Sequence, residues 1–358
     1  MLANFTNYTE FGALRRMKMK SSNKLKMLYL INIMESMTDE EHPISAAGIC
    51  GELKKCGILA ERKSIYRDIA TLTEYGYDIV YTRSPHPGYF LASREFELAE
   101  VKMLADAVQS AGSITASKTS ELIKKLGSLV SKYQFEDISS QVYIDKRVKN
   151  SNEEIYYNID IINKAISKSK KIRFKYLRKS IADNKIESSD KDMIISPYAM
   201  IWSGDHYYLV GNNEKYDNLI HLRIDRMKNV KIMISRARPF SEVSDYTDKF
   251  DAADYAGRTF NMFGGTKQTV ELRCSNFMLE QIIDRFGDNV PLRKSGSEYF
   301  VLYVDAFISE GLISWIMQYG ANIEVLAPRS LRESISDRIM AMSHLYKLNQ
   351  PDAKGINA

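Results

Sequence analysis

The sequence predicts a multidomain α+β protein. Its 358 residues are enough for two or three domains. The N-terminal part carries apolar residues at helical spacing, the middle carries runs in which apolar and polar residues alternate, and the C-terminal third mixes the two patterns. We therefore expect helical units and sheet-containing units that follow one another along the chain.

Charge and cysteine content restrict the class of protein. A net charge of +5 is a modest excess that does not by itself indicate nucleic acid. Cys50, Cys56 and Cys274 form no CxxC pair, which favours a reducing cytoplasm over a disulfide framework or a zinc site. No apolar run approaches the ~20 residues that a membrane span needs, and the N-terminus lacks the apolar core of a signal peptide. We expect a cytoplasmic protein without a membrane partner.

Residues 1–22 are expected to form a disordered basic tail. The stretch from Arg15 to Lys26 contains six cations and no acid. A solvated tail, an extension upstream of a later start, and a basic arm that contacts phosphates are all compatible with this composition.

Residues 23–93 predict three helices followed by a β-hairpin. Ser45 has the character of an N-cap for the second helix, and Gly57 supplies its C-terminal turn. In the third helix, Ile65, Ile69 and Leu72 are spaced i, i+4, i+7 and are expected to face the core. Tyr77–Thr82 and Tyr89–Ala92 then predict two strands around a Pro-Gly turn. This is a helix-turn-helix followed by a β-ribbon, or wing.

The outer face of the third helix is the candidate DNA-contacting surface. Cations neutralise phosphates, and Arg can bond guanine through two atoms at once. Solvated surface charge and, for tyrosine, simple packing are the alternatives. The candidate DNA-binding residues, including one from the hairpin, are Arg62, Lys63, Ser64, Tyr66, Arg67 and Arg83.

Residues 94–150 predict a helical linker, with helices over 96–111 and 120–133. A connector, a dimer contact and a plain packing role remain open for them.

Residues 151–238 predict a helix followed by a small antiparallel sheet or barrel. A helix is expected from Tyr157 to Ser169. An amphipathic strand follows within Lys168–Lys179, a stretch that holds seven cations and no acid, and then comes a polar hairpin loop over 181–191. Tight turns separate the last three strands, which are expected at Ile194–Trp202, His206–Gly211 and Leu219–Met227.

The remainder predicts a linker over residues 239–267 and a C-terminal domain over residues 268–349. The domain has the order strand, helix, strand, strand, helix, strand, with a further helix at its end. That order is a ferredoxin-like plan. Ser309 is expected to cap the second of its helices.

Several motifs carry a resemblance to a known family. HYYLVG, with Pro197 upstream and RIDRM at 223–227, resembles the WYL domain of bacterial transcription regulators, with Tyr207 in place of the tryptophan of that name. SIYRDIATLTEYGYDI at 64–79, followed by GYFL, resembles the winged helix-turn-helix head that accompanies WYL domains. MFGG at 262–265, Trp315 and Gly320 resemble the C-terminal extension of these regulators, of the WCX type.

The resemblance implies a small β-barrel of the Sm-like or SH3-like kind that senses an effector, in several members nucleic acid or a nucleotide. Side chains of Arg, His, Tyr and Ser can hold a phosphate and stack on a base. The alternative is that the tyrosines are core residues and the arginines pair with nearby acids. The candidate effector-binding residues are Tyr176, Ser196, His206, Tyr208, Arg223 and Arg226.

No catalytic motif is present: the sequence has no GxGxxG, P-loop, GxSxG or HExxH pattern. We therefore expect a regulator and not an enzyme, with no cofactor or metal. Its expected partners are double-stranded DNA, an anionic nucleic-acid or nucleotide effector, and a second copy of the chain in a homodimer. There are two alternatives. One is a regulator that responds to a small-molecule metabolite, and the other is a nucleic-acid-binding accessory protein that does not bind duplex DNA.

Overall fold

The computed structural model describes residues 23–346 apart from residues 85, 142–148, 183–184 and 245–249. The expected basic tail, residues 1–22, lies outside them. The described chain mixes helices with antiparallel sheets, which confirms the α+β class. It forms two compact units that divide between Ser151 and Asn152.

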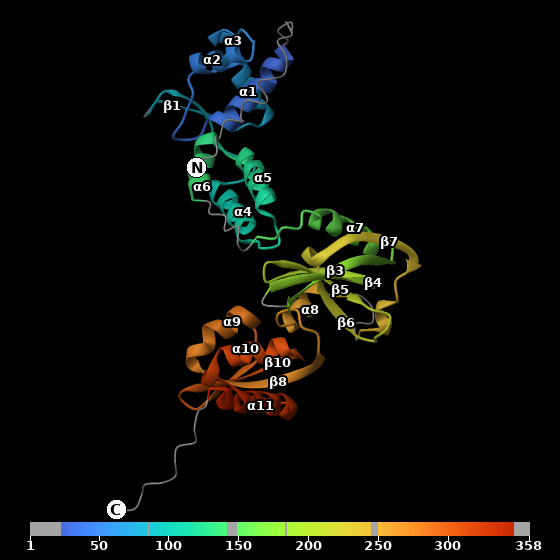
Figure 1. Cartoon of the computed structure of the whole chain (residues 1–358). Helices are drawn as coiled ribbons and strands as arrows, with labels where there is room; N and C mark the ends of the chain where they lie inside the picture. Colours follow the sequence, from blue (N-terminus) through green and yellow to red (C-terminus); the bar gives the residue numbers. More distant parts are fainter. Residues whose placement is uncertain (1–22, 85, 142–148, 183–184, 245–249, 347–358) are drawn as a thin grey trace, which may run out of the picture. The chain divides into compact units, whose positions relative to one another are not determined.

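The first unit begins with three helices and a two-stranded hairpin (Figure 1). Ser45 caps the second helix as predicted, because its hydroxyl accepts a hydrogen bond from the Gly48 amide. Ile65, Ile69 and Leu72 are buried in a core shared by the three helices. The elements are α1 (Asn23–Met37), α2 (Ala46–Lys55), α3 (Arg62–Tyr75), β1 (Ile79–Thr82) and β2 (Gly88–Leu91).

Three helices follow the hairpin where two were expected: α4 (Leu98–Ser110), α5 (Ala116–Leu126) and α6 (Lys132–Ser140). The expected helix over 120–133 was wrong in both of its bounds. Thr115 and Ser131 are the physical reason. Each of these hydroxyls accepts a hydrogen bond from the amide three residues later, and each therefore begins a helix of its own.

Asp39 connects these helices to the preceding three. Its carboxylate accepts hydrogen bonds from the Ser131 hydroxyl and from His42, whose ring stacks on Tyr133 at a centroid distance of 3.7 Å. Burial opposes ionisation of Asp39, but the hydrogen bonds from Ser131 and His42 outweigh it, and the pKa of Asp39 is lowered. Arg94 also donates to two backbone carbonyls near the end of α1. These contacts support a packing role for the helices.

The second unit opens with α7 (Ile155–Ser167), which packs against a five-stranded antiparallel sheet (Figure 1). The hydrogen-bonded order is β6-β5-β4-β3-β7. The sheet is open, so the expected closed barrel was wrong: among the described strands, no ladder joins β6 to β7, and the short helix η3 (Ile224–Arg226) carries the chain between them. The strands are β3 (Lys170–Ala182), β4 (Lys185–Ser203), β5 (His206–Asn212), β6 (Leu219–Arg223) and β7 (Met227–Arg236).

Two segments of this sheet differ from the sequence prediction. Residues 181–191 were expected to be a loop, but β3 and β4 stay paired as far as Ala182 and Lys185. This extension carries few buried side chains, so it lacks the apolar alternation by which strands are found. Leu219–Met227 was expected to be one strand. The strand ends at Arg223, and the chain turns through η3, where the Asp225 carboxylate folds back onto the Arg223 guanidinium.

The segment after β7 is ordered against the sheet where a linker was expected. It contains η4 (Phe240–Glu242) and α8 (Ala252–Arg258), and the Asp251 carboxylate caps α8. Tyr255 of α8 is buried in a small cluster with Ile201 and Val210 of the sheet. Its side chain forms part of the wall of a cavity between this segment and the sheet.

The C-terminal part forms a second antiparallel sheet, in the order β11-β8-β10-β9. The element order is the predicted one, strand-helix-strand-strand-helix-strand and a final helix, and Ser309 caps α10 as predicted by accepting from the Leu312 amide. The elements are β8 (Thr266–Ser275), α9 (Leu279–Phe286), β9 (Leu292–Ser295), β10 (Tyr299–Ile308), α10 (Glu310–Gln318), β11 (Ile323–Ala327) and α11 (Arg329–Leu345).

Candidate functional site

The outer face of α3 presents the predicted cations to solvent. Arg62, Lys63 and Arg67 are exposed, and Tyr66 is exposed to 49%. Lys63 and Arg67, each two residues from the buried Ile65, project away from it, and Arg62 lies at the first position of α3. Along the part of the chain that the structure describes, none of the three cations forms an ion pair with a carboxylate. Their charge is available to a phosphate.

Ser64 and Asp68 have a structural role in the same helix. Lys26 of α1 is buried, and its ammonium group contacts the Asp68 carboxylate at 2.8 Å and donates to the Ser64 hydroxyl. Ser64 is therefore engaged with α1, unlike its neighbours Arg62 and Lys63. Lys26 is also removed from the basic arm that the sequence suggested.

The hairpin places the remaining candidate near its tip. Arg83 follows β1 and is exposed. Tyr66 and Tyr81 both lie against Tyr89 of β2, at centroid distances of 6.3 and 5.0 Å. The aromatic contacts connect the outer face of α3 to the hairpin, so both present one continuous polar and aromatic surface.

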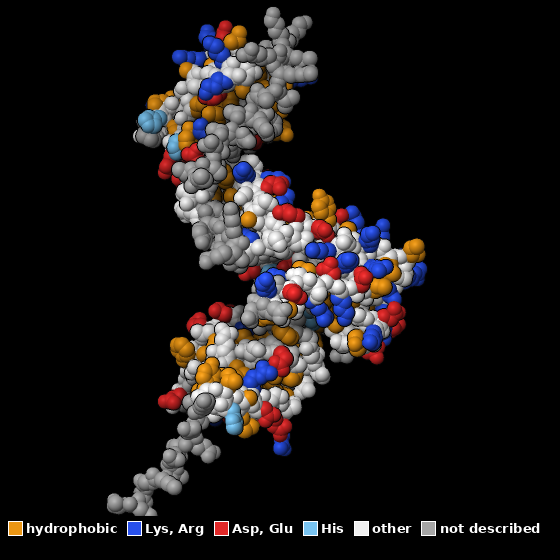
Figure 2. Space-filling model, in the orientation of Figure 1, with side chains coloured by type: hydrophobic (Ala, Val, Ile, Leu, Met, Phe, Trp, Pro, Cys, Tyr) orange, Lys and Arg blue, Asp and Glu red, His pale blue; other side chains and the backbone are white. Residues whose placement is uncertain are grey.

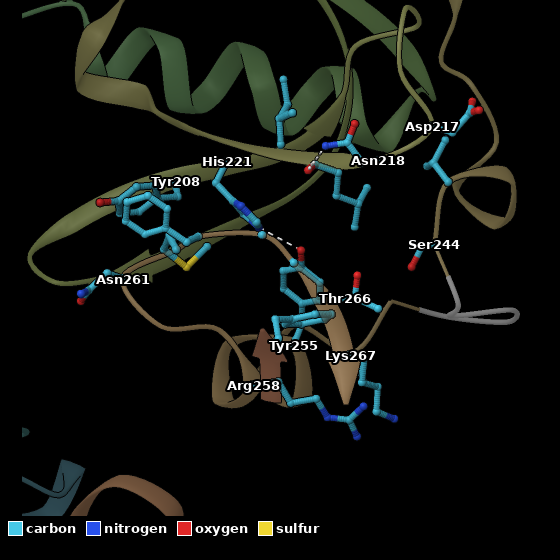
Figure 3. A pocket seen from close by; sticks show the side chains of 18 of the residues that line it. Tyr208, Asp217, Asn218, His221, Ser244, Tyr255, Arg258, Asn261, Thr266 and Lys267 are labelled. Atoms are coloured by element: carbon cyan, nitrogen blue, oxygen red, sulfur yellow. Dashed lines mark hydrogen bonds between the residues drawn. The ribbon is translucent and has the colours of Figure 1, made fainter. Parts of the chain in front are cut away.

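A cavity of about 1270 Å³ lies in the second unit, between the β5–β6 side of the sheet and the segment from α8 to β8 (Figure 3). Four of the six candidate effector-binding residues line it: Tyr176, Tyr208, Arg223 and Arg226. Ser196 and His206 do not. Most of the other lining residues lie in the expected linker and in the next sheet, and the sequence did not indicate them. They include His221, Tyr255, Arg258, Asn261, Lys267 and Phe307.

Arg223 is held in place by a buried carboxylate. Its guanidinium contacts both oxygens of Asp225, at 3.0 and 2.7 Å, and Asp225 is only 7% exposed. The same guanidinium donates to Nδ1 of His206 at 3.1 Å, so the neutral His206 ring carries its proton on Nε2. Burial lowers the pKa of His206, and the adjacent Arg223 charge lowers it further. His206 thus positions Arg223 from behind the cavity.

Arg226 is the more available cation of the cavity. It is exposed, and no carboxylate of the described chain forms an ion pair with it. Its nearest polar group is the Tyr176 hydroxyl, which also accepts a hydrogen bond from the Arg223 amide at 3.3 Å. Burial raises the pKa of Tyr176, and the Arg226 charge partly opposes that shift. Tyr176 and Arg226 together offer a hydroxyl and a cation at one wall.

The acids in the lining are neutralised locally. Arg238 contacts Asp217 at 2.8 Å and Glu242 at 3.0 Å, and Arg258 contacts Asp254 at 2.6 Å. Lys267 lies 3.5 Å from Asp305. These pairs leave Arg226 as the cation of the lining without a described carboxylate partner.

His221 and Tyr255 form a buried polar contact in the wall. His221 Nε2 lies 2.9 Å from the Tyr255 hydroxyl, the contact drawn in Figure 3. Burial lowers the pKa of His221 to about 4 and raises that of Tyr255 to about 12. Both groups are therefore neutral near pH 7, and they connect β6 to α8 across one side of the cavity.

The candidates outside the cavity have structural partners. Ser196 is buried, and its hydroxyl accepts a hydrogen bond from the Arg238 amide at 2.9 Å. The seven cations of Lys168–Lys179 are not in the lining either. The alternation of β3 explains this: Tyr176 points inward with Ile172 and Phe174, and the cations between them point outward.

The described residues contain no group of three or more His, Cys, Asp or Glu side chains arranged to hold a metal ion. None of their helices is both long and apolar enough to cross a membrane.

Comparison with known families identifies two domains in the second unit. Residues 157–232 match the WYL domain, and residues 266–343 match the WCX domain. A curated relative, described as an uncharacterized HTH-type transcriptional regulator, YobV of Bacillus subtilis (strain 168), is 22% identical over 295 residues. That alignment covers 80% of this chain and 90% of the relative. The resemblance to WYL-domain regulators is confirmed.

Two solved structures are also similar to the chain. Proteasome accessory factor B/C (PafBC) of Arthrobacter aurescens is 15% identical, with a TM-score of 0.29, over 94% of this chain and 51% of PafBC. The chain thus spans about half the length of that protein. A CRISPR Cas-related protein is 13% identical, with a TM-score of 0.35, over 93% of this chain and 88% of that protein.

His221 makes the stability of the second unit depend on pH. Its folded-state pKa of about 4 lies below the ordinary value of 6.5, so the unfolded chain binds more protons between these values. The free energy of unfolding should fall by up to about 3 kcal/mol from this group as pH drops from 6.5 to 4. Urea unfolding at several pH values, with His221→Gln beside wild type, measures this. The variant should lose the part of the pH dependence that His221 contributes and keep the part from His206, whose pKa is also lowered by burial, whereas the exposed His344→Gln is the matched control. Equal pH dependence in wild type and His221→Gln would contradict the assignment.

Proposed function

Because the chain carries a WYL domain followed by a WCX domain, we propose that it is a DNA-binding transcriptional regulator whose DNA affinity is set by an anionic effector. The WYL domain and the HTH-type relative support a transcriptional regulator. The proposal of DNA binding rests on the exposed cations of α3, which have no carboxylate partner among the described residues. The proposal of an anionic effector rests on the cavity that Arg226 lines.

The three helices and hairpin of the first unit are proposed to act as a winged helix-turn-helix. α3 would enter the major groove, with Arg62, Lys63 and Arg67 divided between phosphates and base edges. Tyr66 and Arg83 extend that surface along the hairpin. In the C-terminal sheet, the strand order β11-β8-β10-β9 supports the ferredoxin-like plan.

Removal of the α3 cations should abolish specific DNA binding. Arg62→Ala/Arg67→Ala is expected to weaken binding to a cognate fragment by ~1–3 kcal/mol for each arginine that reads a base. Gel shifts on genomic fragments of the source organism, at one fixed salt concentration, measure this. Arg293→Ala/Lys294→Ala removes two exposed cations of β9 and is the matched control. Unchanged duplex affinity in a folded Arg62/Arg67 variant would sink the assignment and favour an accessory protein that does not bind duplex DNA.

A homodimer is proposed because one small head offers few base contacts. α4 supports it by exposing Leu98 to 41%, Met103 to 72% and Leu104 to 40%, while Val101 and Ala105 of the same helix are buried. Half-sites should then lie about one helical turn, ~34 Å, or a multiple of it, apart. Light scattering at micromolar concentration should give twice the chain mass, and Met103→Glu/Leu104→Glu should give the monomer mass. A monomer in wild type, with and without DNA, would count against the dimer.

The effector is proposed to be single-stranded nucleic acid or a nucleotide. Arg226 and Arg223 supply positive charge, the buried Tyr176 supplies its hydroxyl, and the partly buried Tyr208 ring provides a surface on which a base can stack. The local pairing of Asp217, Glu242 and Asp254 removes the acids that would repel a phosphate. A small anionic metabolite would use the same cations without the stacking surface, and this is the alternative.

Arg226→Ala is the sharper test of the effector site. Arg223→Ala would leave the buried Asp225 carboxylate without its partner, at a cost to stability of about 3–5 kcal/mol, so lost binding would be ambiguous. Loss of the exposed Arg226 should weaken an anionic ligand by about 1.5–3 kcal/mol, roughly 10- to 100-fold, and leave the fold intact. Fluorescence anisotropy of labelled oligonucleotides and nucleotides measures the change, with Arg293→Ala as control.

The same titrations distinguish the alternatives. Tyr208→Leu should weaken ligands that contain a base and spare simple anions, since stacking contributes ~1–3 kcal/mol per base. Effector binding should also change duplex affinity by a coupling of ~1–3 kcal/mol, with the reciprocal change in effector affinity. If Arg226→Ala leaves every ligand's affinity intact, the cavity is not the effector site.

A further inference from the structure

The outer face of the β3–β7 strand pair carries like charges directly opposite one another. In the antiparallel register, Arg173 pairs with Lys231 and Lys175 pairs with Lys228. Residues directly opposite project to the same face of a sheet, and so do residues two apart on one strand, as Arg173 and Lys175 are. Lys228 and Lys231 are three apart, but the register shifts between the two pairs. This β-bulge leaves both lysines on the outer face, while Val230 between them is buried. All four side chains are exposed. They form one block, which we call the four-cation block.

The four-cation block is poorly compensated within the chain. Asp192 of β4 lies directly opposite Lys175 in the register and 3.6 Å from Arg173. A single carboxylate thus faces two of the four cations, and because Arg173 and Asp192 are both about 60% exposed, their pair contributes little. In the described part of the chain, no carboxylate forms an ion pair with Lys175, Lys228 or Lys231. Like charges directly opposite in a sheet are destabilising. The arrangement therefore costs stability that a bound polyanion would restore.

The block is separate from the effector cavity. The cavity residue of β3, Tyr176, points into the core with Phe174, whereas Arg173 and Lys175 point the other way. α7 packs on the core side through Ile155 and Ile162, so it does not cover the block. Figure 2 shows Lys and Arg side chains, with some acidic ones among them, on the surface over this part of the sheet.

We propose that the four-cation block is a second anion-binding surface, which takes the phosphate backbone of nucleic acid without reading its sequence. Two parallel rows of cations suit a linear polyanion. The neighbouring exposed side chain, Ile194, is aliphatic, and the block includes no aromatic ring on which a base could stack. Protein segments that bind a membrane surface commonly insert aromatic side chains into it. Because the block has none, an anionic membrane is the less favoured partner. The proposal does not depend on the effector cavity or on α3.

Salt dependence of binding tests the proposal in the full chain. The block variant is Lys175→Gln/Lys228→Gln/Lys231→Gln, and the control, Lys124→Gln/Arg293→Gln/Lys294→Gln, removes the same charge from exposed positions elsewhere. The probes are a labelled 30-nucleotide single strand and a mixed-sequence 30-base-pair duplex. Each lost phosphate contact lowers the slope of log K against log salt by about 0.7–0.9. We expect the block variant to lose a slope of about 2–3 on at least one probe, and the control to keep the wild-type slope.

Three outcomes would overturn the proposal. One is a block variant with the slope and affinity of the control on both probes. Another is a block variant that no longer binds phosphatidylglycerol vesicles but binds both oligonucleotides as wild type does. That result would assign the block to a membrane. The third is a lowered melting temperature of the block variant at low salt. The proposal expects a raised one, because repulsion is relieved, with a smaller gain at high salt.

A background without the α3 cations keeps this result apart from the DNA-binding proposal. In Arg62→Ala/Arg67→Ala protein, the block substitutions should still lower the salt slope. If α3 does not bind DNA, the Arg62/Arg67 change alone leaves duplex affinity unaltered. If the block does not bind nucleic acid, its substitutions change nothing in either background.

Discussion

The period-two alternation of β3 decides where the charged and aromatic groups of the WYL domain lie. Ile172, Phe174 and Tyr176 enter the core against α7 and the neighbouring strands, and Arg173 and Lys175 are left outside. Burial of the three apolar and aromatic side chains is a strong constraint, because a slip of one residue would expose all of them and bury two cations. The cavity and the four-cation block therefore lie on opposite sides of one strand.

Asp225 is the second constraint on the cavity. Asp225 lies with Ile224 in η3, where the chain leaves the strand, and both residues are buried. A buried carboxylate requires a partner, and Arg223 supplies it through two contacts. The turn that follows leaves Arg226 exposed at the cavity wall. One arginine is consequently committed largely to structure and the other remains available to a ligand, although both sit in the same short motif.

The cavity also depends on residues that are distant in sequence. Tyr255 of α8 reaches His221 of β6, and Phe307 of β10 packs against Tyr255 at a centroid distance of 5.2 Å. The wall is thus built from the WYL sheet, the segment after it and the first strands of the WCX sheet. A ligand in the cavity would contact both sheets, which gives it a physical means to change their packing.

The sequence by itself determined the α+β class, most of the helices, the caps at Ser45 and Ser309, and the exposed face of α3. These features depend on local spacing and on hydrogen bonds within a few residues, so the pattern is sufficient. Motif resemblance also located four of the cavity residues. Only the tertiary structure decided that β3 and β4 pair beyond residue 181, that the sheet stays open, that Ser196 and His206 support the site from outside, and that the expected linker forms a cavity wall. Pairing register and the direction of Tyr255 are set by contacts between segments tens of residues apart, and a single sequence contains no local signal for them.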